Sequence, residues 1–415
     1  MQLYRRGHRG PAVAQVRAAL ATLALLPDAD AATAFGNAVF DDACDRAVRA
    51  FQQRRGLSVD GIVGPETFRA LEEARWRLGD RVLSYRVARP FVGDDVAALQ
   101  ERLLELGFDA GRCDGIFGAQ TATALRELQR NYGLVPDGTC GPATLRALRQ
   151  LGRKVVGGRP HLLREDEALA RSGPALIGKT VVVDPGHGGA DRGAVAGGLE
   201  ESAVVADLAA RVEGRLVAAG VTAYLTRGPT TAMTDAQRAD FANNADADLV
   251  LSLHCDASPS PRCHGVATYY YGTYRPGGAT STVGERLAGL VQREVVARTD
   301  LLDCGTHGTS WELLRRTRMP TVRLELGYLT NPGDAARLAA AEFRDTVAEA
   351  VLAAVQRLYL PPELDQPTGV LRLPALAPAE APTSFRPDGR PVPGSWTQAG
   401  VLTRPRRLPA RRRST

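Results

Sequence analysis

The length, composition and charge of the chain already exclude several classes of protein. Its 415 residues, 44% of them hydrophobic, exceed the roughly 250–300 residues that one core supports, so we expect two or three domains. The formal net charge of +6 comes almost entirely from residues 361–415, where nine arginines outnumber four acidic residues. The near-neutral remainder argues against a nucleic-acid-binding body, and the lack of a long apolar run argues against a membrane span.

The first ~150 residues contain a tandem duplication. Phe51–Leu71 recurs as Leu128–Leu148, with eleven of 21 positions identical at a constant offset of 77. Apolar residues at helical spacing precede each copy; they are Val13, Val16, Leu20 and Leu23 in the first, and Val96, Leu99, Leu103 and Leu106 in the second. The apolar run at residues 18–26 imitates a secretory signal peptide. Because it also supplies the first helix of repeat one, we expect it to be retained, which favours a cytoplasmic location.

Each repeat has the pattern of a compact helical unit with Asp-Gly and Gly-Pro turns. We assign the repeats to residues 1–76 and 82–151. Both resemble peptidoglycan-binding domains of the three-helix type, notably through Asp114–Gly118 and the turn at Asp137–Gly138. The resemblance implies an all-α fold, and it leaves glycan, a lipid-linked precursor and another protein open as ligands.

Residues 152–177 are predicted to form a linker with a short helix at 164–171, and the texture changes at residue 178. From there to residue 360, apolar strands alternate with helical patterns, which predicts an α/β domain with a largely parallel sheet flanked by helices. The predicted strands are 181–183, 221–226, 249–253, 266–271 and 321–326, and the predicted helices are 202–219, 235–244, 283–298 and 335–359.

The tail and the cysteines carry less information. Residues 361–415 contain eleven prolines, so we predict a disordered basic tail. Its threonines in basic surroundings suit a Ser/Thr kinase; they are Thr368, Thr383, Thr397 and Thr403. The six cysteines are scattered without a CxxC pair, so we expect reduced, mostly buried thiols, with no support for a Cys113–Cys140 disulfide.

Chemistry-bearing side chains stand at element ends in the α/β region. His187 and His254 come at the ends of two predicted strands, Glu325 lies near the end of a third, and Glu200 and Glu201 open a helix. A single histidine at a strand end is more often structural. However, ligands gather beyond the carboxyl ends of parallel strands, so we expect these groups to converge. Two histidines and a carboxylate form a catalytic zinc set, and one further carboxylate would serve as general base.

Residues 178–358 resemble the catalytic domain of zinc-dependent N-acetylmuramoyl-L-alanine amidases of the amidase_3 family. The resemblance rests on VVVDPGHGG at 181–189, a glutamate before a helix, ANNADADLVLSLHCDAS at 242–258 and MPTVRLELGYLTNP at 319–332. It implies His187, Glu201 and His254 as zinc ligands and Glu325 as the catalytic glutamate, with Glu200 as the alternative ligand. The bound zinc would polarise the scissile carbonyl and activate water.

Three residues depart from the family pattern without removing a ligand. Ser202 stands where lysine is common, Asp256 where asparagine is usual, and Arg323 where a small apolar residue is common. The remaining histidines match no ligand of the family and are expected to be structural or surface residues; they are His8, His161, His264 and His307.

The predicted function is hydrolysis of the amide between N-acetylmuramic acid and L-alanine in peptidoglycan or its precursors. The whole architecture also resembles actinobacterial CwlM-type proteins, which implies an alternative: a weakly active or inactive cytoplasmic regulator of precursor synthesis. Such a regulator would act on the enolpyruvyl transferase MurA and would be controlled by Ser/Thr phosphorylation of its tail. The intact ligand set favours the enzyme. The tail and the expected lack of an export signal favour the regulator.

Overall fold

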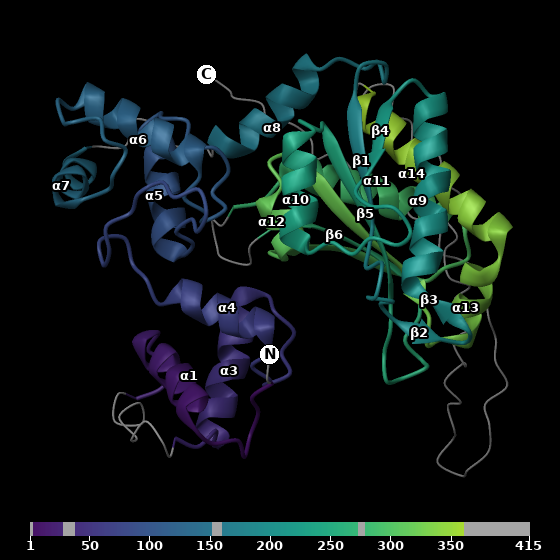
Figure 1. Cartoon of the computed structure of the whole chain (residues 1–415), viewed down its shortest axis with the longest axis horizontal. Helices are drawn as coiled ribbons and strands as arrows, with labels where there is room; N and C mark the ends of the chain where they lie inside the picture. Colours follow the sequence, from purple (N-terminus) through teal and green to yellow (C-terminus); the bar gives the residue numbers. More distant parts are fainter. Residues whose placement is uncertain (1–2, 28–37, 152–159, 273–278, 361–415) are drawn as a thin grey trace, which may run out of the picture. The chain divides into compact units, whose positions relative to one another are not determined.

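The computed structural model describes residues 3–27, 38–151, 160–272 and 279–360 (Figure 1). The predicted tail, with its candidate phosphorylation sites, and residues 152–159 of the predicted linker lie outside these ranges. No helix within them is long and apolar enough to cross a membrane. The described cysteines are all free thiols, four of the six being buried.

Within the described residues, each repeat contains three helices. They are α1 (Pro11–Thr22), α3 (Asp42–Arg55) and α4 (Pro65–Ala74) in the first, and α5 (Asp94–Glu105), α6 (Ala119–Asn131) and α7 (Pro142–Gln150) in the second. Seven of the eight apolar positions that suggested helical spacing are buried, and Val13, Leu20, Val96 and Leu103 have no exposed surface; Leu23 is only partly buried. The signal-like run therefore contributes to the core of the first repeat.

Three buried glutamines hold three Asp-Gly turns of the repeats through the same set of hydrogen bonds. In each set, Nε2 donates to the turn aspartate, to a backbone carbonyl and to a threonine hydroxyl, while Oε1 accepts the N–H of the turn glycine. The sets are Gln52 with Asp60, Gly61 and Thr67; Gln100 with Asp114, Gly115 and Thr121; and Gln129 with Asp137, Gly138 and Thr144. Each of these Asp-Gly pairs is thus tied to its helix by one buried side chain.

After α8 (Pro160–Arg171), the chain builds a six-stranded sheet in the order β4-β1-β5-β8-β6-β7. The strands are β1 (Thr180–Pro185), β4 (Thr222–Leu225), β5 (Leu249–Asp256), β6 (Val266–Tyr271), β7 (Asp303–Thr309) and β8 (Thr321–Tyr328). All neighbouring pairs are parallel except β6 with β8. The predicted α/β fold with a largely parallel sheet is confirmed.

Helices cover both faces of this sheet (Figure 1). One face packs its alternate strand residues, such as Val181, Val183 and Leu251, against α9 (Glu201–Ala218), α11 (Thr282–Arg298) and α14 (Ala341–Tyr359). The intervening residues Val182 and Val250 pack on α10 (Asp235–Asn244). Because strand side chains alternate between faces, His254 lies on the α10 side.

Several element bounds differ from those predicted. β5 continues to Asp256, so His254 lies inside the strand rather than at its end. The predicted helix 335–359 is two helices, α13 (Pro332–Ala339) and α14, because Ala340 adopts extended backbone. The sequence also missed β7, which lacks apolar alternation, the two-residue strands β2 (Val195–Ala196) and β3 (Leu199–Glu200), and the short helix α12 (Glu312–Arg316).

Candidate functional site

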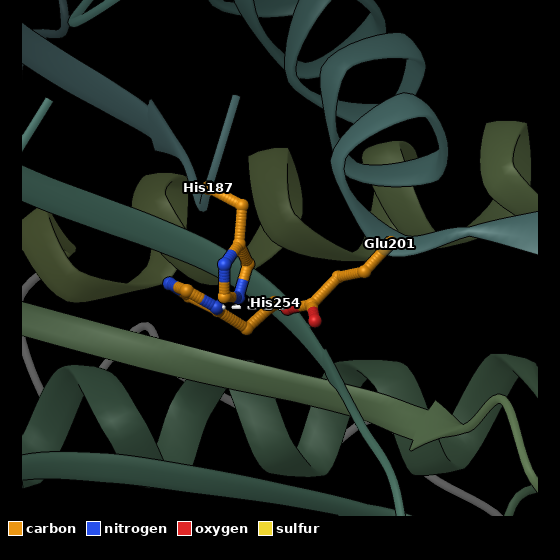
Figure 2. A group of neighbouring side chains, drawn as sticks. All are labelled: His187, Glu201 and His254. Carbon is orange, nitrogen blue, oxygen red and sulfur yellow. Dashed lines mark hydrogen bonds and ion pairs between the residues drawn. The ribbon is translucent and has the colours of Figure 1, made fainter. Parts of the chain in front are cut away.

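Three side chains from three separate elements meet at the carboxyl end of the sheet. His187 lies just beyond β1, Glu201 is the first residue of α9, and His254 belongs to β5. One possible ligand atom of each lies within 4.8 Å of the others, and Figure 2 shows the two imidazoles and the carboxylate pointing toward one point. A Cβ at Gly186 would lie 2.1 Å from Cε1 of His254, so the glycine before His187 is what admits the second imidazole.

Glu201 is the centre of this cluster. Its Oε1 lies 3.1 Å from Nε2 of His187 and 2.9 Å from Nδ1 of His254. The backbone N–H groups of Ala194 and Cys255 donate to its two oxygens. Burial alone would raise the pKa of Glu201, but the hydrogen bonds from His187 and His254 hold it well below its usual value. The carboxylate is therefore ionised and fixed in place.

Glu200, the alternative ligand, lies apart from this cluster. Its side chain is partly exposed and forms an ion pair with Arg192, which precedes β2. Glu200 has an extended backbone and directly precedes the first residue of α9. The structure therefore brings Glu201, and not its neighbour, to the two histidines.

His187 has an unusual backbone and a second carboxylate partner. Its φ of 58° lies in the left-handed region, which costs a non-glycine residue roughly 1–2 kcal/mol. Its Nδ1 lies 2.9 Å from Oδ2 of Asp191. The hydrogen bond with Glu201, and then that with Asp191, raise the pKa of His187. An imidazole held by a carboxylate at one nitrogen, with the other nitrogen directed into a site, is the usual arrangement around bound metals.

His254 is the buried member of the pair. Burial, and then the positive charge of Arg323, lower the pKa of His254 to about 4. The imidazole is therefore neutral near pH 7, which is the form that binds metal. Two imidazoles and one anionic carboxylate with converging lone pairs fit a zinc ion that keeps a fourth position open.

Glu325 lies beside this cluster, on the strand next to β5. It pairs with His254 in the β5–β8 register. Its Oε1 accepts a hydrogen bond of 2.6 Å from Nε of Arg323, whereas its buried Oε2 has no hydrogen-bond partner. Burial raises the pKa of Glu325 to about 7, although Arg323 acts in the opposite direction. A carboxyl group of this kind exchanges a proton readily near neutral pH.

Sequence reasoning missed the groups that support His187. Arg238, on α10, donates to the carbonyl oxygens of Pro185 and His187 and forms a buried ion pair with Asp184. Arg227, after β4, donates to the carbonyls of Pro185 and Gly186. Both arginines are almost fully buried. The position of Arg227 directly after the predicted strand 221–226 was the only hint in the sequence. The carbonyls that it binds are known only from the fold.

The chain matches two family models. The N-acetylmuramoyl-L-alanine amidase model covers residues 181–357, and the peptidoglycan binding domain model covers residues 9–71 and 92–148. The family matches thus span the sheet domain with its cluster, and both helical repeats.

Individual proteins are also similar to the chain. The chain is 49% identical to the N-acetylmuramoyl-L-alanine amidase CwlM of Mycobacterium tuberculosis over 373 residues, which are 88% of this chain and 91% of the relative. It is 35% identical to the amidase LytC of Bacillus subtilis over 42% of this chain and 34% of that protein. Among solved structures it is similar to the amidase AmiC2 of Nostoc punctiforme, with 32% identity, coverage of 43% of this chain and 94% of the other, and a TM-score of 0.39.

Proposed function

Because the chain belongs to the N-acetylmuramoyl-L-alanine amidase family, we propose that it hydrolyses the amide between N-acetylmuramic acid and L-alanine in peptidoglycan or its precursors, with zinc as cofactor. The observation that carries the proposal is the convergence of His187, Glu201 and His254 beside a buried glutamate with one free oxygen. That combination supplies ligands and a proton carrier within one site.

His187, Glu201 and His254 would hold the zinc ion. When bound, zinc polarises the scissile carbonyl and lowers the pKa of water to about 7. The protein keeps these ligands ready for it: Asp191 orients His187, and two backbone N–H groups fix the Glu201 carboxylate. Because these ligands are one carboxylate and two neutral imidazoles, the zinc site would keep a net positive charge, which polarises a carbonyl.

Glu325 would move the proton. Its Oε1 is fixed by Arg323, so Oε2 is the oxygen that accepts a proton from the attacking water. With a pKa of about 7, the same group then donates that proton to the departing amine. The two repeats, which match peptidoglycan binding domains, would hold the glycan or stem peptide near the site.

The test is mass spectrometry of a defined muramyl-L-alanyl peptide incubated with the zinc-loaded full chain. Free stem peptide is expected from the wild type and from Glu342→Gln, a control at an exposed site on α14, but not from Glu325→Gln. Equal zinc content in all three proteins would assign the loss to proton transfer. Equal product from Glu325→Gln would refute the role of Glu325.

A second candidate function is that of a weakly active or inactive cytoplasmic regulator of peptidoglycan precursor synthesis. We propose that it would act on MurA under the control of a Ser/Thr kinase that modifies the tail. The observation that favours it is the Arg323–Glu325 bond, which engages one of the two oxygens of the proton carrier. One zinc ion per chain without any product from the wild type would select this candidate.

A further inference from the structure

Arg227 is a buried cation that donates hydrogen bonds to four backbone carbonyls, three of them in the segments that carry His187 and Glu201. It is 4% exposed. Nε donates to the Pro185 carbonyl at 2.8 Å, and Nη2 donates to the carbonyls of Gly186 at 2.6 Å and Ser202 at 3.3 Å. Nη1 donates to Gly228 at 3.2 Å. Neutral carbonyls, and not a carboxylate, thus surround the guanidinium.

Such burial is unfavourable for the guanidinium. Burial, and then the nearby Arg238, lower the pKa of Arg227, while Asp184 and Asp191 act in the opposite direction. A buried charge needs hydrogen bonds that replace those to water, and in some proteins such a group is kept because it fixes one conformation.

The carbonyls that Arg227 joins come from the two segments that carry the first two candidate ligands. Pro185 and Gly186 directly precede His187, and Ser202 directly follows Glu201. A single guanidinium therefore links the end of β1 to the first turn of α9. The link joins two segments whose ligands are 14 residues apart in the sequence, and it adds to the backbone hydrogen bonds from Glu201 and Ser202 to Ala194 and Arg192.

The geometry of the neighbouring glycine serves the same arrangement. Gly188 has a φ of +119°, and a Cβ there would lie 2.6 Å from Nε of Arg227. His187 itself is in the left-handed region. A strained backbone persists only where its surroundings determine it. Here Arg227 and Arg238 bind the carbonyls of three consecutive residues, 185–187.

We infer that Arg227 is a positioning residue that preforms the zinc-binding geometry by fixing the His187 loop against the start of α9. This inference rests on the proposed function for the identity of the metal, and it adds a residue outside the proposed ligand set. Removal of the guanidinium frees the loop to leave its strained conformation. Zinc affinity then falls because the ligands must be ordered at the moment of binding.

The experiment measures zinc Kd by competition with a chromophoric chelator for the full chain and for Arg227→Met and Arg227→Lys. Arg227→Met is expected to weaken zinc binding about 10–100-fold, as is typical of residues that orient metal ligands, and Arg227→Lys is expected to recover part of the loss. In a His187→Ala background the effect of Arg227→Met should shrink, because the residue acts through His187.

Arg102 provides a matched control. It donates to the Leu148 carbonyl within the second repeat, so Arg102→Met should lower stability and leave zinc Kd unchanged. Amide hydrogen exchange of residues 186–189 and 202–203 in the metal-free protein gives a second readout, and it should accelerate in Arg227→Met. If that variant does not fold, Arg227→Lys carries the test through the same two measurements.

The outcomes separate this inference from the proposed function. Unchanged Kd and unchanged exchange in a less stable Arg227→Met would reduce Arg227 to a structural residue and overturn the inference. Weaker zinc binding in the variant, with no hydrolysis by the wild type, would support the inference and refute the amidase activity. A wild type that binds no zinc would overturn both.

Discussion

Nε of Arg323 donates a hydrogen bond of 2.6 Å to Oε1 of Glu325, two residues further along the same strand. Both side chains lie on the face of the sheet that carries His254, and the guanidinium also stacks on the ring of Trp311 at 4.7 Å. The pair leaves one carboxylate oxygen fixed and the other free. Burial and the neighbouring cation therefore have opposing effects on the ionisation of Glu325.

Glu325→Gln should stabilise the metal-free protein at high pH. Glu325 has a pKa of about 7 in the fold, raised from an ordinary value of 4.5. Between these values the unfolded chain is ionised and the folded chain is protonated, so stability declines as pH rises from 4.5 to 7. Since one pKa unit corresponds to about 1.4 kcal/mol, the variant should gain up to about 3 kcal/mol at pH 8.

Urea unfolding of the metal-free variant and wild type at pH 4 and pH 8 checks this prediction. The difference should be near zero at pH 4, where both states of the wild type are protonated, and large at pH 8. Glu342→Gln, at an exposed position, should show no such pH dependence. A stability difference that is the same at both pH values would contradict the raised pKa.

Glu201→Gln and Glu200→Gln should differ sharply in zinc binding although the residues are adjacent. Glu201 is buried between the two imidazoles, whereas Glu200 pairs with Arg192. Glu201→Gln removes an anionic ligand. The zinc Kd of this variant should therefore rise by more than the roughly 10–100-fold that is typical for residues that hydrogen-bond to metal ligands. Glu200→Gln should bind within about twofold of wild type, because exposed ion pairs contribute little. Isothermal titration calorimetry with zinc measures both Kd values. A larger loss of affinity in Glu200→Gln than in Glu201→Gln would assign Glu200 as the ligand.

Gly188→Ala should destabilise the sheet domain, whereas Gly214→Ala should stabilise it slightly. An alanine Cβ at residue 188 would lie 2.4 Å from the Thr231 carbonyl, at a φ of +119°. We expect a loss of about 1–3 kcal/mol. Gly214 is exposed in the middle of α9 with no atom near the added Cβ, so alanine should add about 0.5–1 kcal/mol. Thermal melts of both variants test the contrast, and equal shifts would refute it.

Gln129→Met should unfold the second repeat selectively. Its amide holds Asp137, Gly138 and Thr144, and it is buried. Loss of the amide leaves several polar groups without partners, at about 1–3 kcal/mol each. Limited proteolysis should cut the variant within residues 82–151 first. Gln150→Met, at the exposed end of α7, serves as the control and should resist cleavage like the wild type.

Much of this architecture could be predicted from the sequence because its signals are local. The duplication, the apolar spacing of the repeat helices and the strands around His187, His254 and Glu325 all follow from periodicity and from turn residues. The split between α13 and α14 and the strand β7 escaped prediction, because backbone at Ala340 and pairing along β6 depend on distant parts of the chain.

By itself the sequence determined which elements form and which residue types stand at their ends, since these depend on neighbours along the chain. Only the tertiary structure shows that Glu201 lies between the two histidines while Glu200 pairs with Arg192, because adjacent residues at a helix start point in different directions. It also decided that Arg227 and Arg238 bind the His187 loop and that Arg323 pairs with Glu325. The physical reason is burial: each of these charges acts through partners that folding brings together and removes from water.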